Sequence, residues 1–147
     1  MSVQDNLKID EENIAAWNAH DVDRFLAIVS DDIMWNDVSN PQPFQGKEAV
    51  RQYMQGWFSA FPDMKITVTN RLVTEDQVAG ELEFTGTNSG PLQFGPGGPA
   101  IPATGKQANG KATYFVRIKN GKAVEVHTYP DTAGMMMQLG LMPMPGS

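Results

Sequence analysis

Asp131 is the carboxylate of this sequence best placed to do chemistry. It lies in the segment YPDTAGMMMQLGLMP, residues 129–143, shortly before a run of methionines. Apolar surroundings raise the pKa of a carboxyl group, and its carboxylate can then take a proton from carbon beside a carbonyl. An aspartate before Thr-Ala-Gly is also a good helix N-cap. The sequence leaves two roles open for Asp131, a catalytic base and a cap.

Three further positions could take part in such chemistry. Asn88 shares strand parity with Phe84, so it could point inward and stabilise an enolate oxygen, although it also suits the turn before Ser89-Gly90-Pro91. Trp35 and Asp37 share one strand face, so an inward Trp35 makes Asp37 a second acid/base, and the alternative is a surface carboxylate at the strand end. Alternation puts His127 and Tyr129 on the outer face, but curvature near Pro130 could bring Tyr129 beside Asp131 as a donor.

No metal or cofactor site is predicted. The chain has no cysteine and two histidines, His20 and His127, which lie far apart without a carboxylate pattern. The GPGGPA stretch, residues 95–100, lacks the strand-to-helix setting of a phosphate-binding loop.

The first 61 residues predict three helices. One covers residues 4–18. A short one presents Val22, Phe25, Leu26 and Val29 on one face. The third follows a loop at residues 40–50 and Gly46. Its inward side chains are Val50, Met54, Trp57, Phe58 and Phe61.

From Met64 onward the hydrophobic period changes from helical to two, which predicts strands of an antiparallel sheet. Ile66, Val68 and Leu72 are expected to face inward in the first of them, and Val124 and Val126 in the last. Asn120-Gly121 predicts a tight hairpin. Residues 88–110 are rich in Gly and Pro and predict a long loop, either a lid or a disordered connection, with Leu92, Phe94 and Ile101 available for burial.

Length, charge and hydrophobic pattern argue against several classes of protein, namely nucleic-acid-binding, membrane and secreted proteins. The length of 147 residues suits one domain, residues 1–147, and the net charge of −6 without a basic run argues against nucleic acid and anionic membranes as partners. No apolar stretch approaches a membrane span, and the acidic N-terminus is unlike a signal peptide. We therefore expect a cytoplasmic protein.

The sequence resembles the SnoaL-like polyketide cyclases and their ester-cyclase relatives. The stretches that carry the resemblance are AWNAHDVDRFLAIVSDD, AFPDMKI, GTNSGPL, PATGK and YPDTAGMMMQLGLMP. The resemblance covers nearly the whole chain. It implies the nuclear transport factor two-like fold, an α+β cone in which N-terminal helices pack on the concave face of a curved antiparallel sheet around a deep apolar pocket.

The resemblance also implies roles for residues. Asp131 matches the acid/base of an intramolecular aldol ring closure, whereas Asn88 stands where members commonly carry a histidine. The helix and strand residues expected to contact an apolar ligand are Trp17, Trp35, Asp37, Met54, Trp57, Phe61, Phe84, Tyr129 and Met135. Relatives of this fold usually pair through the outer sheet face, so a homodimer is expected.

Three functions are compatible with this reading. The first is a cofactor-independent cyclase or isomerase acting on an apolar carbonyl compound. The second is a ligand-binding protein without chemistry, which the replacement of the histidine by Asn88 favours. The third is an epoxide hydrolase, which would need Asp131, Asp37 and an arginine, Arg51 or Arg71, around a water.

Overall fold

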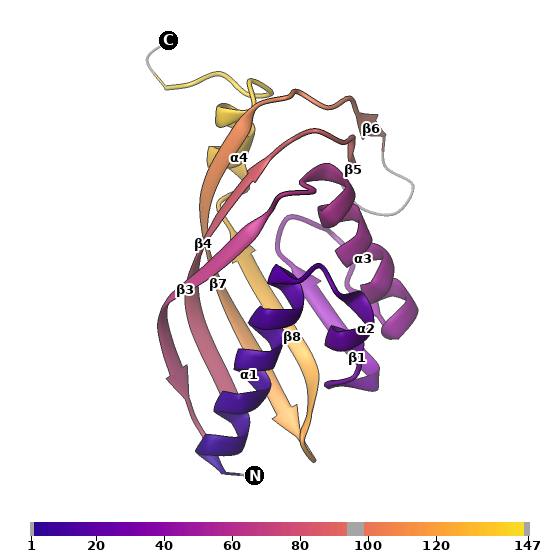
Figure 1. Ribbon diagram of the computed structural model, residues 1–147, viewed down its shortest axis with the longest axis vertical. Helices are drawn as coiled ribbons and strands as arrows, with labels where there is room; N and C mark the ends of the chain where they lie inside the picture. Colours follow the sequence, from indigo (N-terminus) through magenta and orange to yellow (C-terminus); the bar gives the residue numbers. More distant parts are fainter. Residues whose placement is uncertain (1, 94–98, 146–147) are drawn as a thin grey trace.

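Helices cover one face of a curved sheet (Figure 1). The computed structural model describes residues 2–93 and 99–145. Helices α1 (Val3–Asn18), α2 (Val22–Leu26) and α3 (Lys47–Ala60) lie on the concave face, and the short α4 (Thr132–Gln138) lies at one end of the sheet. This arrangement confirms the predicted α+β cone. None of the described helices is long and apolar enough to cross a membrane.

The main sheet has the strand order β2-β1-β8-β7-β4-β3. Its strands are β1 (Val29–Asp37), β2 (Phe44–Gln45), β3 (Lys65–Val73), β4 (Gln77–Thr87), β7 (Gln107–Lys119) and β8 (Lys122–Pro130). All neighbouring pairs are antiparallel except β1 and β8, which run parallel. A hairpin forces antiparallel pairing, but most of the chain lies between β1 and β8, so either direction is open to them.

Local sequence signals explain the element ends. Ser2 and Asp5 form a reciprocal capping box at the start of α1. Gly46 precedes α3 and has a backbone φ of 87°, which residues other than glycine rarely adopt. Asn120 and Gly121 have φ of 51° and 74°, which is the hairpin turn predicted for this pair.

A bulge in β3 makes the predicted alternation wrong for two residues. The pairing with β4 shifts between Val68 and Asn70, and the extra residue reverses the faces beyond it. Leu72 is consequently 66% exposed, and Arg71 turns inward against α1.

A second irregularity, in the β7–β8 pairing, changes the last strand. The register shifts between Arg117 and Ile118, so Ala123 and Val126 are the buried pair, and Val124 is only half-buried. Beyond Val126 the alternation is as expected. Val29 also departs from prediction, since it begins β1 instead of lying on the face of α2.

The described parts of the Gly/Pro-rich segment, residues 88–93 and 99–110, are more ordered than predicted. They contain a two-stranded sheet of β5 (Leu92–Gln93) and β6 (Ala100–Ile101), and β7 begins within the predicted loop, at Gln107. Leu92 is buried and Ile101 half-buried, as expected. Phe94 lies outside the described residues. Residues 40–50, predicted as a loop, include β2 and, from Lys47, the start of α3.

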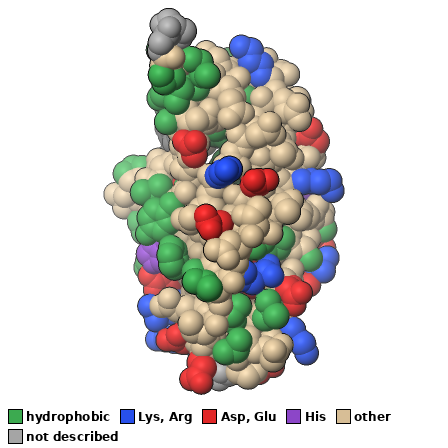
Figure 2. All heavy atoms as spheres, turned by 90° about the vertical axis from the view of Figure 1, so that its left-hand side faces the viewer, with side chains coloured by type: hydrophobic (Ala, Val, Ile, Leu, Met, Phe, Trp, Pro, Cys, Tyr) green, Lys and Arg blue, Asp and Glu red, His purple; other side chains and the backbone are tan. Residues whose placement is uncertain are grey.

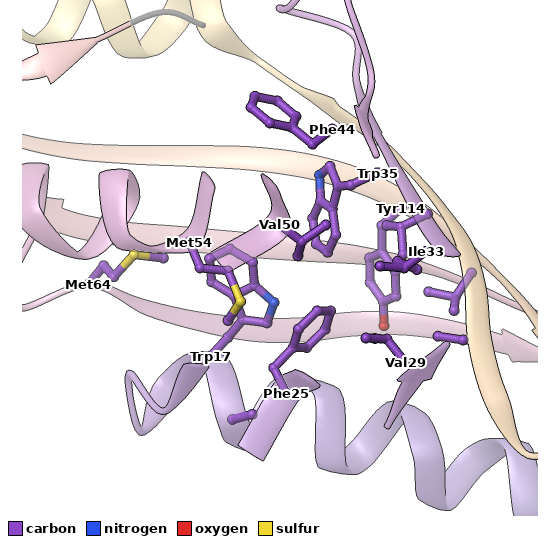
Figure 3. Close-up of a cluster of buried hydrophobic side chains, with 14 of the residues drawn as sticks. Trp17, Phe25, Val29, Ile33, Trp35, Phe44, Val50, Met54, Met64 and Tyr114 are labelled. Carbon is purple, nitrogen blue, oxygen red and sulfur yellow. The ribbon is translucent and has the colours of Figure 1, made fainter. Parts of the chain in front are cut away.

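The core lies between the helices and the sheet. Figure 3 shows Trp17 and Phe25 rising from the helices toward Trp35, with Val50 and Met54 of α3 beside them and Tyr114 reaching across from the sheet. On the side of the sheet turned away from the helices, hydrophobic side chains gather in patches broken by charged ones (Figure 2).

Candidate functional site

An apolar cavity of about 130 Å³ lies between α1, α3 and the concave face of the sheet. We call it the apolar cavity, and its wall includes Trp17, Trp35, Trp57, Ile66, Phe84 and Met135. Five of these six side chains were predicted as ligand contacts, and the structure brings them together. Aromatic packing orders the wall, since the Trp57 ring contacts the Phe84 ring edge-on at 5.7 Å between centroids.

Two predicted contacts lie behind this wall. Met54 and Phe61 are completely buried and do not line the cavity. Phe61 packs against Trp57 and Phe84, with ring centroids 5.8 Å and 5.1 Å away. Both side chains therefore shape the site through the residues that line it.

Asp131 lies at the rim of the apolar cavity, where β8 ends. Its Oδ1 accepts a hydrogen bond of 2.9 Å from the Gly134 backbone N–H, which makes it the N-cap of α4. Among the described residues, none donates a hydrogen bond to its Oδ2. The two roles that the sequence left open are therefore compatible, because one oxygen caps the helix and the other remains available to a ligand.

Asn88 does not reach the apolar cavity. Its side chain is fully buried and makes four hydrogen bonds within the protein. The amide nitrogen donates to the backbone oxygens of Ala60 and Gly90, and the amide oxygen accepts from the backbone N–H and the hydroxyl of Thr104. An asparagine side chain can make no more than this, so Asn88 ties α3 to the segment after β4 and is not placed to bind a substrate.

Tyr129 lies on the outer face of the sheet, as strand alternation indicates. It is 47% exposed and packs edge-on against Phe115, 6.2 Å between ring centroids. His127 is on the same face, where its Nε2 lies 2.6 Å from Glu125. The structure thus does not place Tyr129 as a donor inside the cavity.

A buried polar cluster lies beside one end of the apolar cavity. Asp10 of α1 is 1% exposed, and its Oδ2 accepts from Arg71 Nε at 2.8 Å and from the Tyr114 hydroxyl at 2.6 Å. Asn13 donates to Oδ1 at 3.1 Å. Burial and the charge of Asp10 raise the pKa of Tyr114 above its ordinary value. The carboxylate is therefore matched by a cation and two neutral donors.

A second cavity, of about 190 Å³, adjoins the first. We call it the polar chamber; its wall includes Asp37, Asn40, Phe44, Tyr53, Gly56 and Trp57. Asp37 is 4% exposed, which confirms that it shares an inward face with Trp35, and its Oδ2 accepts from the Tyr53 hydroxyl at 2.6 Å. Tyr53, Trp57, Thr132 and Met135 line both cavities and so form the partition between them.

Sequence reasoning missed Tyr53 and Asn13, which line the cavities, and the pairing of Asp10 with Arg71 in the buried polar cluster. Tyr53 follows Val50 by three residues and precedes Trp57 by four, so helical periodicity already placed it on the inward face of α3. Asp10 and Asn13 lie on the inward face of α1, but an apolar pattern does not reveal polar residues there. Arg71 was hidden by the bulge, which no local signal in the sequence indicates.

The arginines do not complete an epoxide hydrolase site. Arg51 pairs with Asp23 and Glu48, and Arg71 pairs with Asp10. Within residues 2–93 and 99–145, no ion pair joins either arginine to Asp37 or Asp131. The same residues contain no group of three His, Asp or Glu side chains that could hold a metal ion.

Solved structures with the same architecture include three informative neighbours. A protein described as a "putative SnoaL-like polyketide cyclase" from Jannaschia sp. CCS1 is 17% identical, with 95% of this chain and 94% of that chain covered and a TM-score of 0.82. AclR, described as a "putative hydroxylase" from Streptomyces galilaeus, is 25% identical, with coverages of 99% and 87% and a TM-score of 0.82. An NTF2-like protein of unknown function from Burkholderia pseudomallei K96243 is 19% identical, with coverages of 95% and 98% and a TM-score of 0.74.

These neighbours show that the fold is the nuclear transport factor two-like cone. A comparison with curated proteins finds no match. The model of the family "SnoaL-like polyketide cyclase" matches residues 8–139, which run from within α1 through the whole main sheet to the residue after α4. This chain therefore belongs to the SnoaL-like polyketide cyclase family.

Proposed function

We propose that the protein catalyses proton transfer and aldol-type ring closure, or a related isomerisation, of an apolar carbonyl compound bound in the apolar cavity. The observation that carries the proposal is the position of Asp131 at the cavity rim, with Oδ2 available while Oδ1 caps α4. Membership of the SnoaL-like family supports the same reaction class.

The proposed chemistry needs only this carboxylate and the cavity wall. Asp131 takes a proton from carbon beside a carbonyl, and the resulting enolate carbon forms a bond to a second carbonyl carbon of the same molecule. The carboxyl group then returns the proton to the alkoxide oxygen, so the reaction is balanced without a co-reactant. Thr128 and Thr132 line the cavity, and their hydroxyls are candidates to stabilise the enolate oxygen.

The fold explains why such a base could work here. The wall of the apolar cavity is dominated by aromatic and aliphatic side chains, which suit an apolar ligand whose reacting carbon lies beside Asp131 at the exposed rim. The N-cap hydrogen bond fixes the carboxylate at the start of α4, so its free oxygen keeps one direction relative to the cavity.

Asp131→Asn tests the proposal with little structural disturbance, because the amide oxygen still accepts from Gly134. The probe is tetralone, a bicyclic ketone, and the measurement is deuterium exchange of its protons beside the carbonyl by NMR in D₂O. The wild type is expected to accelerate exchange, and the variant to lose at least about a hundredfold of that acceleration. Full activity of Asp131→Asn would exclude Asp131 as the base.

A second candidate is a binding protein without chemistry. Asn88 favours it, because the residue that stands in the family's histidine position is fully used in structural hydrogen bonds. This candidate predicts that tetralone binds to wild type and Asp131→Asn with equal affinity and that neither protein accelerates exchange.

We further propose that the protein forms a homodimer through the outer sheet face. Phe115 and Tyr129 are 44% and 47% exposed there and contact each other, which provides an apolar centre for an interface. Sedimentation of wild type and Phe115→Lys tests it. A dimer that the substitution converts to monomer supports the proposal, and a monomeric wild type excludes it.

A further inference from the structure

Asp37 is a buried carboxylate whose charge no cation of the described chain matches. It is 4% exposed and accepts two hydrogen bonds, from the Tyr53 hydroxyl at 2.6 Å and from the Ser39 backbone N–H at 2.8 Å. No Lys, Arg or His occurs among the described residues that line the polar chamber. Residues 94–98, which follow Gln93 in the sequence, are Phe-Gly-Pro-Gly-Gly and include no cationic side chain. A buried charge that is hydrogen-bonded but unpaired is costly, and a bound cation would offset that cost.

The rest of the chamber wall suits an ammonium group. Phe44, Tyr53 and Trp57 bring three aromatic rings to it, and aromatic rings attract cations. Asn40 also lines the chamber, and its amide oxygen is buried and accepts no hydrogen bond from any described residue. An N–H of a protonated amine would satisfy it. The net charge of −6 favours the approach of a cation over that of an anion.

The chamber has space for such a group. Gly56, an exposed position of α3, is part of the chamber wall, and a Cβ added there would meet no atom within 4 Å, so the wall is open at this point. Glycine inside a helix costs roughly 1 kcal/mol relative to alanine. The helix bears this cost at a position that faces the chamber.

We propose that the polar chamber binds a protonated amine, with Asp37 as its counter-ion, the aromatic side chains around its carbon substituents and the Asn40 amide oxygen accepting one N–H. Because Tyr53, Trp57, Thr132 and Met135 separate this chamber from the apolar cavity, one ligand can place an apolar body in the cavity and an amine in the chamber. The binding site goes beyond the proposed ring closure and does not depend on it.

The pair of Tyr53 and Asp37 is suited to hold the charge in place. Burial, together with the charge of Asp37, raises the pKa of Tyr53 well above its ordinary value. The phenol therefore remains a neutral donor, and it fixes one carboxylate oxygen so that the charge faces the chamber.

Calorimetric titration with benzylammonium chloride tests the site, with benzyl alcohol as a neutral ligand of the same shape. The wild type is expected to bind the ammonium at least about tenfold more tightly than the alcohol, as a desolvated cation beside a carboxylate and aromatic rings should. Equal affinity for both, or no binding of benzylammonium, overturns the proposal.

Two variants locate the binding. Asp37→Asn keeps the side-chain shape and is expected to remove the tenfold preference, whereas Asp32→Asn, an exposed carboxylate on the same strand, is expected to keep it. Gly56→Leu places a side chain in the chamber, improves the helix and leaves Asp37 intact. It is expected to weaken benzylammonium at least about tenfold, and unchanged binding would show that the amine binds elsewhere. If benzylammonium does not bind as expected, the deuterium exchange attributed to Asp131 is unaffected. The two proposals can therefore be tested separately.

Discussion

Two buried aspartates in this protein each accept a hydrogen bond from a tyrosine hydroxyl, but only one of them has a cation beside it. Asp10 and Asp37 each accept from a tyrosine hydroxyl at 2.6 Å, from Tyr114 and Tyr53 respectively. Asp10 has Arg71 at 2.8 Å, whereas the described part of the chain offers Asp37 no cation. The ion pair of Asp10 and Arg71 joins α1 to β3 and is structural. Asp37, a carboxylate without a cation at a cavity wall, is a candidate binding site.

The largest expected difference between them is in stability. Asp10→Asn should lower the free energy of unfolding by about 3 kcal/mol, because it leaves the partly buried Arg71 guanidinium unpaired. Asp37→Asn should lower it by less than about 1 kcal/mol, because no cation loses its partner. Urea unfolding of both variants measures this contrast. Equal losses would mean that Asp37 has a structural role like that of Asp10.

The two tyrosines should make the protein sensitive to alkaline pH. Both have pKa values raised above the ordinary 10.0, so the folded protein keeps protons that the unfolded chain loses. The stability that they contribute is complete below about pH 10 and is lost as pH rises further, at roughly 1.4 kcal/mol per pH unit for each tyrosine. Between pH 9 and 11, the free energy of unfolding should therefore fall less steeply with pH in Tyr114→Phe and in Tyr53→Phe than in the wild type. The same slope in Tyr114→Phe as in wild type, with Tyr129→Phe as the exposed control, would contradict this assignment.

Asp131 provides a third case, because it is exposed and accepts its hydrogen bond from the Gly134 backbone N–H instead of a tyrosine hydroxyl. Asp131→Ala should cost about 1 kcal/mol of stability through loss of the α4 N-cap, while Asp131→Asn should cost less because its amide oxygen can still accept. Thermal unfolding followed by circular dichroism separates the two variants. Equal losses would show that the carboxylate charge, and not the cap geometry, stabilises α4.

The smallest effect is expected at the β3 bulge, which decides which residue meets Asp10. Leu72→Gln should change the free energy of unfolding by less than about 0.5 kcal/mol because Leu72 is 66% exposed. Arg71→Gln, one residue earlier, should cost several times more. A large loss in Leu72→Gln would place Leu72 in the core and remove Arg71 from the cluster.

Much of the fold could be predicted from local patterns. The inward face of α3, the Asn120-Gly121 turn and the N-cap that was one of two roles open to Asp131 each depend on residues close together in sequence, and the structure contains all three. The predictions for Leu72 and Val124 failed because a bulge reverses or displaces a strand face without changing the composition around it.

Less of the site could be predicted. Five apolar wall residues were anticipated because large hydrophobic side chains on inward faces must meet in a cone of this size. Asp131 was anticipated through the motif that carries the family resemblance. Asn88 and Tyr129 were placed as possible site residues, but the structure uses the first for backbone hydrogen bonds and leaves the second on the outer face. The sequence around a polar side chain does not reveal its hydrogen-bond partner when that partner lies far away in the chain.

The sequence by itself determined the family through its motifs, and with the family the cone. Hydrophobic period and turn chemistry, which are local properties, also placed Trp35 and Asp37 on one strand face, but only the tertiary structure decided that this face is buried. Only the tertiary structure decided which carboxylate has a cation. Arg71 reaches Asp10 across 61 positions of chain through a bulge, and Asp37 meets Tyr53 at the wall of a chamber that exists only when β1, α3 and α4 pack together. Charge pairing inside a protein depends on distance and burial, and both are set by packing.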